Sequence, residues 1–161
     1  MSKELLKKGE KVIVTTRSIK KKIDNYQFLK IQKKVKFVKL DVNNKNEVKI
    51  IVKKFKPYKI FYFAGQSSLT KSHKYKKETL ISHYNGTKNF LEIIKDENLK
   101  LKFFKANSGY IFSPKKGYIN LNCKFSYNKN PYILAQQKTF KLIKKFPKSK
   151  LIKIKNIRNY L

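Results

Sequence analysis

Short apolar runs alternate with longer helical stretches along the whole 161-residue chain, with no repeat, no low-complexity linker and no boundary rich in proline or glycine. This alternation is typical of α/β proteins in which helices connect the parallel strands of one sheet. The run KIFYFA (Lys59–Ala64) is apolar at nearly every position, which predicts a strand buried on both faces. The expected strands are Lys11–Thr15, Val35–Leu40, Lys59–Ala64, Leu101–Ala106 and Leu151–Lys155, and the expected helices are Ser2–Lys8, Lys45–Phe55, Thr79–Glu97 and Pro131–Phe146.

The start of the chain departs from the usual order of such a fold. Gly9 fits the position that closes a first helix, because glycine adopts a positive φ at little cost, so the chain opens within a helix and then enters a strand. A doubly wound sheet normally opens with a strand and a glycine-rich turn before that helix. The five glycines of the chain form no G-x-G-x-x-G. We therefore predict a Rossmann-like, doubly wound parallel sheet that lacks the first strand and the glycine-rich loop.

The missing strand would be the central one in the strand order 3-2-1-4-5-6. The strands that begin at Lys11 and Lys59 would then pair directly, or they would leave unpaired backbone groups at a buried edge. Between these strands, Asn44 is expected to cap the helix that follows the second strand, with Glu47 as its capping-box partner.

The charge of the chain is strongly positive, with 41 lysines and arginines against 9 aspartates and glutamates and a formal net charge of +32. Such a charge attracts polyanions. Only Arg17 and Arg158 are arginines, however, and proteins that read nucleic acid usually rely on arginine for bidentate contacts. The lysines are spread along the whole chain, so we interpret them as a solvated surface rather than as a nucleic-acid footprint, which is the alternative.

The aromatic residues allow a similar choice. They interleave with lysines and in that way resemble surfaces on which nucleic-acid bases stack. Most of them fall on inward positions of the expected strands and helices, and we therefore assign them to the core. The examples are Phe61, Phe63, Phe90 and Phe140.

Several classes of protein are excluded by composition. No run approaches the roughly 18 apolar residues of a membrane-spanning helix, and the first ten residues hold no apolar signal-peptide core. The single cysteine, Cys123, excludes a disulfide framework and is expected to be a bystander thiol. His73 and His83 have no cysteine or carboxylate at ligand spacing, so no metal site is expected. These features predict a soluble, single-domain protein of the cytoplasm.

Four segments resemble, in their order, the extended short-chain dehydrogenase/reductases, which include the NAD-dependent epimerases and dehydratases. The segments are KPYKIFYFAGQSSL, ISHYNGTKNFLEII, FFKANSGYIFSP and NPYILAQQKTFKLIKKF. The pattern P-x-x-I-x-x-x-A-x-Q-S, followed by A-x-S-x-x-x-F and N-P-Y, is most similar to GDP-mannose 4,6-dehydratases. The resemblance runs from about Leu5 to Asn156. It implies one partial NAD(P)-binding domain over residues 1–161, without the sugar-nucleotide-binding C-terminal portion.

The resemblance implies NADP or NAD as cofactor, GDP-mannose or a related sugar nucleotide as substrate, and a homo-oligomer or a paralogue as protein partner. Arg17 matches the arginine that faces the adenosine 2′-phosphate of NADP, and Asp41 matches the acid that binds the adenine. Ala64, Gly65 and Gln66 match the strand end where the backbone passes close to the cofactor ribose and pyrophosphate. The alternatives are a surface cation for Arg17, a helix-start residue for Asp41 and an ordinary tight turn at Gly65.

Two residues match the catalytic positions of the family. Ser108 corresponds to the serine or threonine whose hydroxyl bonds the sugar's reacting 4-oxygen, and Tyr132 to the tyrosine that takes the 4-hydroxyl proton as hydride moves to the nicotinamide. The family lysine one helical turn after the tyrosine is replaced by Gln136, which can bind the cofactor ribose but carries no charge. Lys138 does not replace it, because it lies roughly 240° around the helix from Tyr132.

The glutamate that removes the C5 proton in dehydratases is also replaced. Its position, two residues after Ser108, is Tyr110, and no carboxylate follows Glu97 in the sequence. We therefore expect an impaired or inactive dehydratase as this chain alone. The alternative is a non-catalytic pseudoenzyme or binding module that pairs with an intact dehydratase or binds polyanions through its lysines.

Overall fold

The computed structural model describes residues 1–113, 119 and 122–146. The chain divides into two compact units, Met1–Asp41 and Val42–Leu161, and each is described by itself. None of the helices in the described part of the chain has the length and apolar character needed to cross a bilayer.

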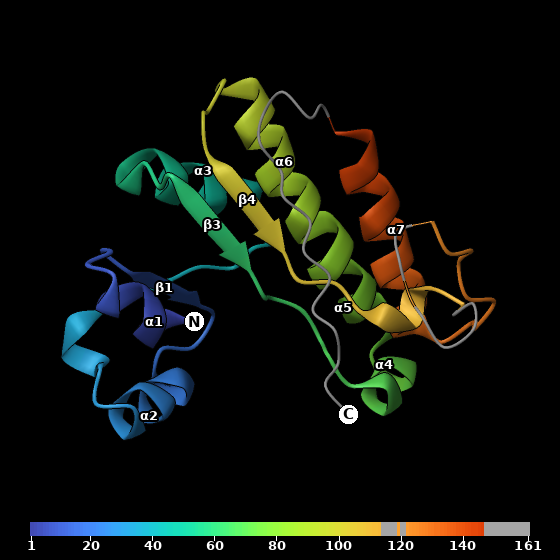
Figure 1. Cartoon of the computed structure of the whole chain (residues 1–161), viewed down its shortest axis with the longest axis horizontal. Helices are drawn as coiled ribbons and strands as arrows, with labels where there is room; N and C mark the ends of the chain where they lie inside the picture. Colours follow the sequence, from blue (N-terminus) through green and yellow to red (C-terminus); the bar gives the residue numbers. More distant parts are fainter. Residues whose placement is uncertain (114–118, 120–121, 147–161) are drawn as a thin grey trace. The chain divides into compact units, whose positions relative to one another are not determined.

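The first unit is a small parallel pair of strands with two helices (Figure 1). Ile13 lies opposite Lys36 in the ladder, and Thr16 opposite Lys39. Gly9 has a φ of +73° and follows the end of the first helix, as the sequence predicts. The elements are α1 (Ser2–Lys7), β1 (Ile13–Thr16), α2 (Lys20–Phe28), the 3-10 turn η1 (Gln32–Lys34) and β2 (Lys36–Lys39).

The second unit holds another parallel pair, in which Lys59 lies opposite Lys102. Helices α3 and α6 pack against each other, and α7 lies alongside the long helical segment that α5 begins (Figure 1). The elements are α3 (Lys45–Phe55), β3 (Lys59–Tyr62), α4 (Leu69–Lys74), α5 (Lys76–Leu80), the π turn η2 (Ile81–Asn85), α6 (Gly86–Asp96), β4 (Lys102–Lys105), the 3-10 turn η3 (Gly109–Ile111) and α7 (Pro131–Lys145).

Most expected elements are confirmed, and the parallel α/β fold is correct. The expected helix Thr79–Glu97 is instead divided by the π turn η2, and it begins earlier, with α5. The sequence did not predict α2. None of the residues of this helix is buried, so its sequence KKKIDNYQF shows no apolar stripe. The six-residue α4 was not predicted either. The expected strand Leu151–Lys155 lies outside the described residues.

The described strands form two separate sheets, β1–β2 and β3–β4. Among the described residues of the second unit, β3 is hydrogen-bonded along one side only, to β4.

This arrangement corrects the prediction that KIFYFA is buried on both faces. Tyr62 is buried and packs edge-to-face on Phe90 of α6, but Phe63 is 51% exposed, so its assignment to the core is wrong. Phe61 is half-buried; it stacks on Phe63 and contacts Phe104 of β4. Because side chains alternate along a strand, only one face of this sheet is covered by α6. Phe90 and Phe140 are core residues, as predicted.

The start of α3 is set by the predicted cap. The Asn44 side chain accepts hydrogen bonds from the backbone N–H groups of Asn46 and Glu47, at 3.1 and 3.2 Å, and donates to the Glu47 carboxylate at 3.0 Å. We expect Asn44→Ala to lower the free energy of unfolding by about 1 kcal/mol, the usual value of such a cap. Asn44→Ser should retain most of it. Urea denaturation measures both, and equal losses would contradict the capping role.

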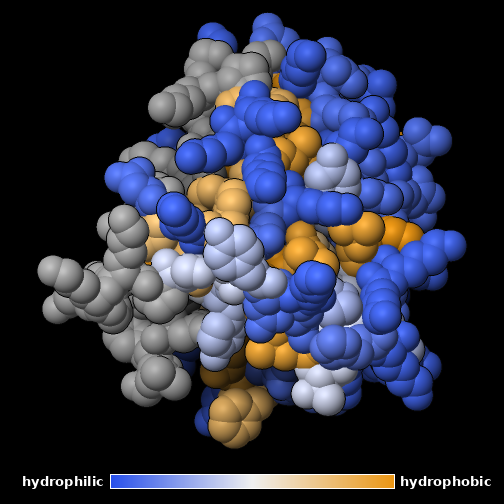
Figure 2. Space-filling view, turned by 90° about the vertical axis from the view of Figure 1, so that its right-hand side faces the viewer, coloured by the Kyte–Doolittle hydropathy of each residue, from blue (hydrophilic) through white to orange (hydrophobic). Residues whose placement is uncertain are grey.

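Lysines dominate the surface, and Figure 2 shows one face on which hydrophilic residues surround smaller apolar areas. Some of these lysines pair with acids across α3 and α6: Lys45 lies 2.7 Å from Glu92, while Lys49 and Lys53 each lie 2.8 Å from Glu97. Pairs this exposed contribute little to stability. They nevertheless use two of the chain's nine acidic residues, Glu92 and Glu97, to connect these two helices.

Candidate active site

The candidate site is formed in the second unit, where β3 and β4 end and where η2 and α7 face them. In open parallel sheets, ligands bind at the carboxyl ends of the strands. Ala64, Gly65 and Gln66 follow β3, and Ser108 follows β4. Tyr132 and Gln136 lie on the first two turns of α7.

Gly65 is required by its surroundings. Its φ is +129°, a conformation that L side chains rarely adopt. A Cβ at this position would lie 2.3 Å from Cε1 of His83. The absence of a side chain therefore lets the imidazole of η2 lie directly against the backbone that follows β3.

His83 is buried and held in one tautomer. Its Nε2 lies 2.7 Å from the carbonyl oxygen of Gln66, and because a carbonyl only accepts, Nε2 carries the proton. Nδ1 is buried and has no hydrogen-bond partner among the described residues. Burial, with a smaller contribution from the positive charge of Lys105, lowers the pKa of His83 to about 4. His83 is therefore neutral near pH 7 and presents an unused acceptor.

Tyr132 is held at the beginning of α7. Asn130 caps this helix by accepting from the Tyr132 backbone N–H at 2.9 Å, and Pro131 occupies the first helical position. The half-buried phenol ring lies edge-on to the His83 ring, with centroids 5.5 Å apart. Gln136, one turn later, donates from Nε2 to the Tyr132 oxygen at 3.2 Å.

Lys105 is the second buried ionisable group of the site. It is the last residue of β4 and only 2% exposed. Its Nζ donates to the carbonyl oxygen of Ala106 at 2.6 Å and to Oε1 of Gln136 at 3.4 Å, and it lies 5.4 Å from the centroid of the Tyr62 ring. Burial lowers the pKa of Lys105 to about 8.

Ser108 lies at the end of the segment that follows β4. It is 7% exposed, and its hydroxyl accepts from the Tyr110 backbone N–H at 3.3 Å as the cap of η3. The neighbouring Asn107 accepts from the Ser108 N–H at 3.0 Å, while its own Nδ2 is buried and has no hydrogen-bond partner in the described part of the chain. The turn η3 packs against α7. Tyr110, at the predicted glutamate position, is 51% exposed.

The structure thus brings together five residues around Tyr132, of which the sequence predicted Gly65, Gln66 and Gln136. His83 and Lys105 were missed as site residues. A signal for Lys105 existed, since it continues the inward alternation of Leu101 and Phe103 in the strand. His83 shares its buried helix face with the polar residues Thr79 and Thr87, four positions before and after it.

Two predicted cofactor residues belong to the first unit. Arg17 is exposed and directly follows β1, and Asp41 lies two residues after β2. Because β1 and β2 are parallel neighbours, both residues occur at the carboxyl edge of that sheet. Their position relative to Tyr132 stays a prediction.

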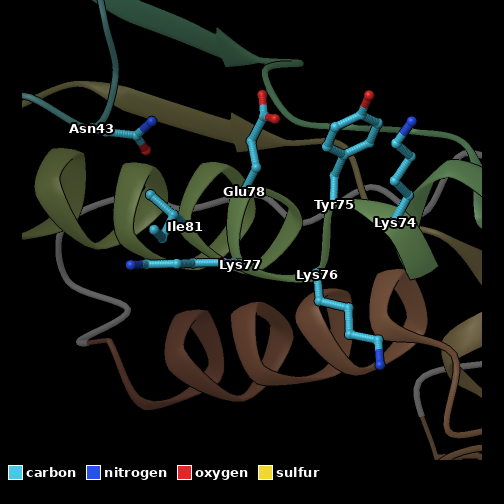
Figure 3. Close-up of a pocket in the computed structure, with 7 residues that line it drawn as sticks. All are labelled: Asn43, Lys74, Tyr75, Lys76, Lys77, Glu78 and Ile81. Atoms are coloured by element: carbon cyan, nitrogen blue, oxygen red, sulfur yellow. The ribbon is translucent and has the colours of Figure 1, made fainter.

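An open hollow of about 430 Å³ lies elsewhere in the second unit (Figure 3). Its lining residues are Asn43, Lys74, Tyr75, Lys76, Lys77, Glu78 and Ile81. None of them belongs to the predicted site, and most are exposed helix residues. We therefore place the chemistry at the strand ends rather than in this hollow. Within the described residues, no three histidine, cysteine or acidic side chains gather as a metal would require.

Comparison with known proteins is consistent with this fold. Residues 1–160 match the sequence model of the family described as "NAD dependent epimerase/dehydratase family". No curated protein sequence matches the chain significantly.

Solved structures match over nearly the whole chain. UDP-glucose 4-epimerase from Thermus thermophilus, in complex with NAD, has a TM-score of 0.78 at 21% identity, covering 95% of this chain and 48% of the other. The dTDP-glucose 4,6-dehydratase from Bacillus anthracis, also with NAD, has a TM-score of 0.75 at 16% identity, with coverage of 95% and 48%. WbmG from Bordetella bronchiseptica, with NAD and UDP, has a TM-score of 0.73 at 10% identity, covering 94% and 46%. The chain spans about half the length of these structures.

Proposed function

Because the chain belongs to the NAD dependent epimerase/dehydratase family, we propose that it binds NADP or NAD and a sugar nucleotide at the site around Tyr132. Its closest functional type is then the GDP-mannose 4,6-dehydratases, which its motifs resemble. The main support is the buried polar cluster at the strand ends, in which Tyr132 contacts both His83 and Gln136.

Some polar atoms of the cluster make no hydrogen bond to the described residues and can therefore bind a ligand. Within the residues that the structure describes, Nδ1 of His83 is an unused acceptor and Nδ2 of Asn107 an unused donor, and both are buried. Buried polar atoms without partners are rare in folded proteins. The bare backbone at Gly65 also permits close approach. These features fit the nicotinamide end of a dinucleotide and the reacting end of a sugar, and both are polar groups that bind through hydrogen bonds.

In this proposal residues 1–161 form one NAD(P)-binding domain. Arg17 and Asp41 would hold the adenosine part, and the backbone of Ala64, Gly65 and Gln66 would line the ribose and pyrophosphate. The sequence offers no G-x-G-x-x-G for the pyrophosphate itself. The bound dinucleotide would supply the hydride acceptor.

The side chains of this protein would hold the sugar and accept its proton. The Tyr132 oxygen takes the proton of the sugar 4-hydroxyl, and the Ser108 hydroxyl holds the reacting 4-oxygen. Gln136 orients the phenol by its hydrogen bond and can also reach a ribose hydroxyl. A tyrosine acts as a base near neutral pH only when its environment stabilises the phenolate.

Loss of water from the sugar is the step for which this site lacks the expected catalytic group. Tyr110 stands where the resemblance implies a glutamate, and its exposed phenol is a poor replacement for a buried carboxylate acting on C5. This substitution also favours a second candidate function, a non-catalytic partner that binds the same ligands or pairs with an intact dehydratase.

Thermal melts test the binding part of the proposal. We expect NADP to raise the Tm of the 161-residue chain and GDP-mannose to raise it further, by linkage. Tyr132→Phe should reduce the second shift, whereas Tyr127→Phe, at a tyrosine that is 88% exposed, should leave both shifts unchanged. A transition that neither ligand moves would overturn the proposal for this chain.

Turnover distinguishes the two candidates. The double variant Gln136→Lys, Tyr110→Glu should increase the formation of the 4-keto-6-deoxy product by about tenfold or more, since a positioned acid–base group contributes roughly 10²–10⁴-fold. Ligand-induced stabilisation without product in either protein would favour the non-catalytic partner.

A further inference from the structure

A buried lysine is connected to Tyr132 by two hydrogen bonds in series. Nζ of Lys105 donates to Oε1 of Gln136 at 3.4 Å, and Nε2 of Gln136 donates to the Tyr132 oxygen at 3.2 Å. The three side chains come from β4 and from successive turns of α7. The amide of Gln136 therefore lies between an ammonium group and a phenol.

The chemistry of the two ends fixes the orientation of this amide. An ammonium group only donates, so the amide oxygen must face Lys105. The opposite orientation would direct the amide N–H groups at Nζ and the amide oxygen at the phenol. In the orientation of the structure, Nζ of Lys105 donates to the amide oxygen, and the phenol oxygen receives an N–H of the same amide.

No acidic side chain among the described residues neutralises the charge of Lys105. None of the ion pairs among the described residues includes Lys105. The ionisable groups that face it are His83 from η2, Tyr62 from β3 and, through Gln136, Tyr132 from α7. The two tyrosines are polarisable rings, and His83 is neutral near pH 7. A buried cation without a carboxylate destabilises a fold.

We propose that Lys105 is a positioning residue that stabilises, through the amide of Gln136, the negative charge that develops on the Tyr132 oxygen. A cation at the carbonyl end of an amide polarises it, so that its N–H becomes a stronger donor to the oxygen at the other end. In a site from which water is excluded this effect is larger than in solution. The catalytic use of the charge depends on the proposed function, but the electrostatic connection does not.

The proposal also gives the phenol a source of positive charge in place of the lysine of the family motif. Gln136 occupies that lysine's place on α7, and the positive charge instead reaches the phenol from β4. The sequence spacing between Lys105 and Tyr132 hides this connection, because the two residues are connected only through the side chain of Gln136.

NMR of the full chain labelled with [¹³Cζ]tyrosine tests the connection without substrate. The Tyr132 resonance, assigned with Tyr132→Phe, should show an inflection at about pH 8, where Lys105 loses its proton. Lys105→Met should abolish this inflection, and Gln136→Leu should weaken it. Lys138→Met, at an exposed lysine of the same helix, should leave it unchanged.

Two results of this titration would overturn the proposal. One is a Tyr132 resonance that shows no change near pH 8 while the Cε resonance of Lys105 titrates. The other is an inflection that survives in Lys105→Met, since another group would then cause it. Neither result depends on turnover or on ligand binding, so a melt that neither ligand moves would overturn the proposed function and leave the connection testable.

Kinetics provide a second test where turnover is measurable. Lys105→Met should lower kcat at about pH 7 roughly tenfold, while raising Tm because a buried charge is removed. If Lys105 had a purely structural role, any loss of kcat in Lys105→Met would be accompanied by a lower Tm. In the Gln136→Lys background the same substitution should leave kcat unchanged or raise it, because the new lysine supplies the charge directly. An equal loss of kcat in the parent and in the Gln136→Lys background would contradict the proposed connection between Lys105 and Tyr132.

Discussion

Gly86→Ala is expected to lower the free energy of unfolding by about 2 kcal/mol. A Cβ at this position would lie 2.2 Å from the Tyr62 hydroxyl oxygen and 3.0 Å from Cγ2 of Val42. Tyr62 cannot move away easily, because it is 3% exposed and its hydroxyl donates to the carbonyl oxygen of Ser82 at 2.5 Å. Overpacking of this kind costs up to about 3 kcal/mol, and alanine recovers only about 1 kcal/mol of helix propensity.

Gly109→Ala is the matched control. The nearest atom to a Cβ there is Cδ1 of Ile119 at 3.5 Å, an ordinary contact, and the backbone does not have a positive φ. Its effect should stay within about 0.5 kcal/mol. Urea denaturation of both variants provides the comparison. If Gly86→Ala were as stable as the parent, the close contact between α6 and Tyr62 would be refuted.

Acidification from pH 6.5 to pH 4 is expected to remove up to about 3 kcal/mol of stability through His83 alone. In the folded protein burial holds the pKa of His83 at about 4, whereas in the unfolded chain it is near 6.5. Between these values the unfolded state binds the proton and the folded state does not, so stability falls as the pH falls. Above pH 6.5 this contribution is constant.

The pH dependence of stability should therefore become flatter in His83→Gln over this range. His73→Gln, at the exposed second histidine of the chain, is the control and should keep the slope of the parent. Carboxylates that titrate below pH 6.5 affect all three proteins alike, so the difference between variants isolates His83. Equal slopes in the parent and His83→Gln would mean that His83 is accessible to protons in the folded state.

The regular elements could be predicted because local pattern determines them. The helix α3 has the bounds Lys45–Phe55 that the sequence predicts, since a capping asparagine precedes an apolar stripe. The four expected strands that lie in the described residues were placed within two residues at their ends, because short apolar runs between polar turns have few other interpretations.

Residues of the candidate site could be predicted only where they belong to a motif that resembles the family. Ser108, Tyr132 and Gln136 follow from the resemblance, whereas Lys105 and His83 do not, because a charged residue in a strand is usually taken to face solvent. The exposure of Phe63 was also beyond the sequence. An apolar strand is buried on both faces only when elements cover both, and the number of neighbouring strands is not a local property.

The π turn η2 changes which partners one long helical segment can meet. On its amino-terminal side α5 contacts α7, and on its carboxyl-terminal side α6 contacts α3. A turn widened by one residue rotates everything beyond it by about 100° relative to a continuous α-helix. The segment therefore works as two helices set out of phase, and His83 lies at the step between them. A single added residue in the winding therefore lets one helical segment contact both α7 and α3.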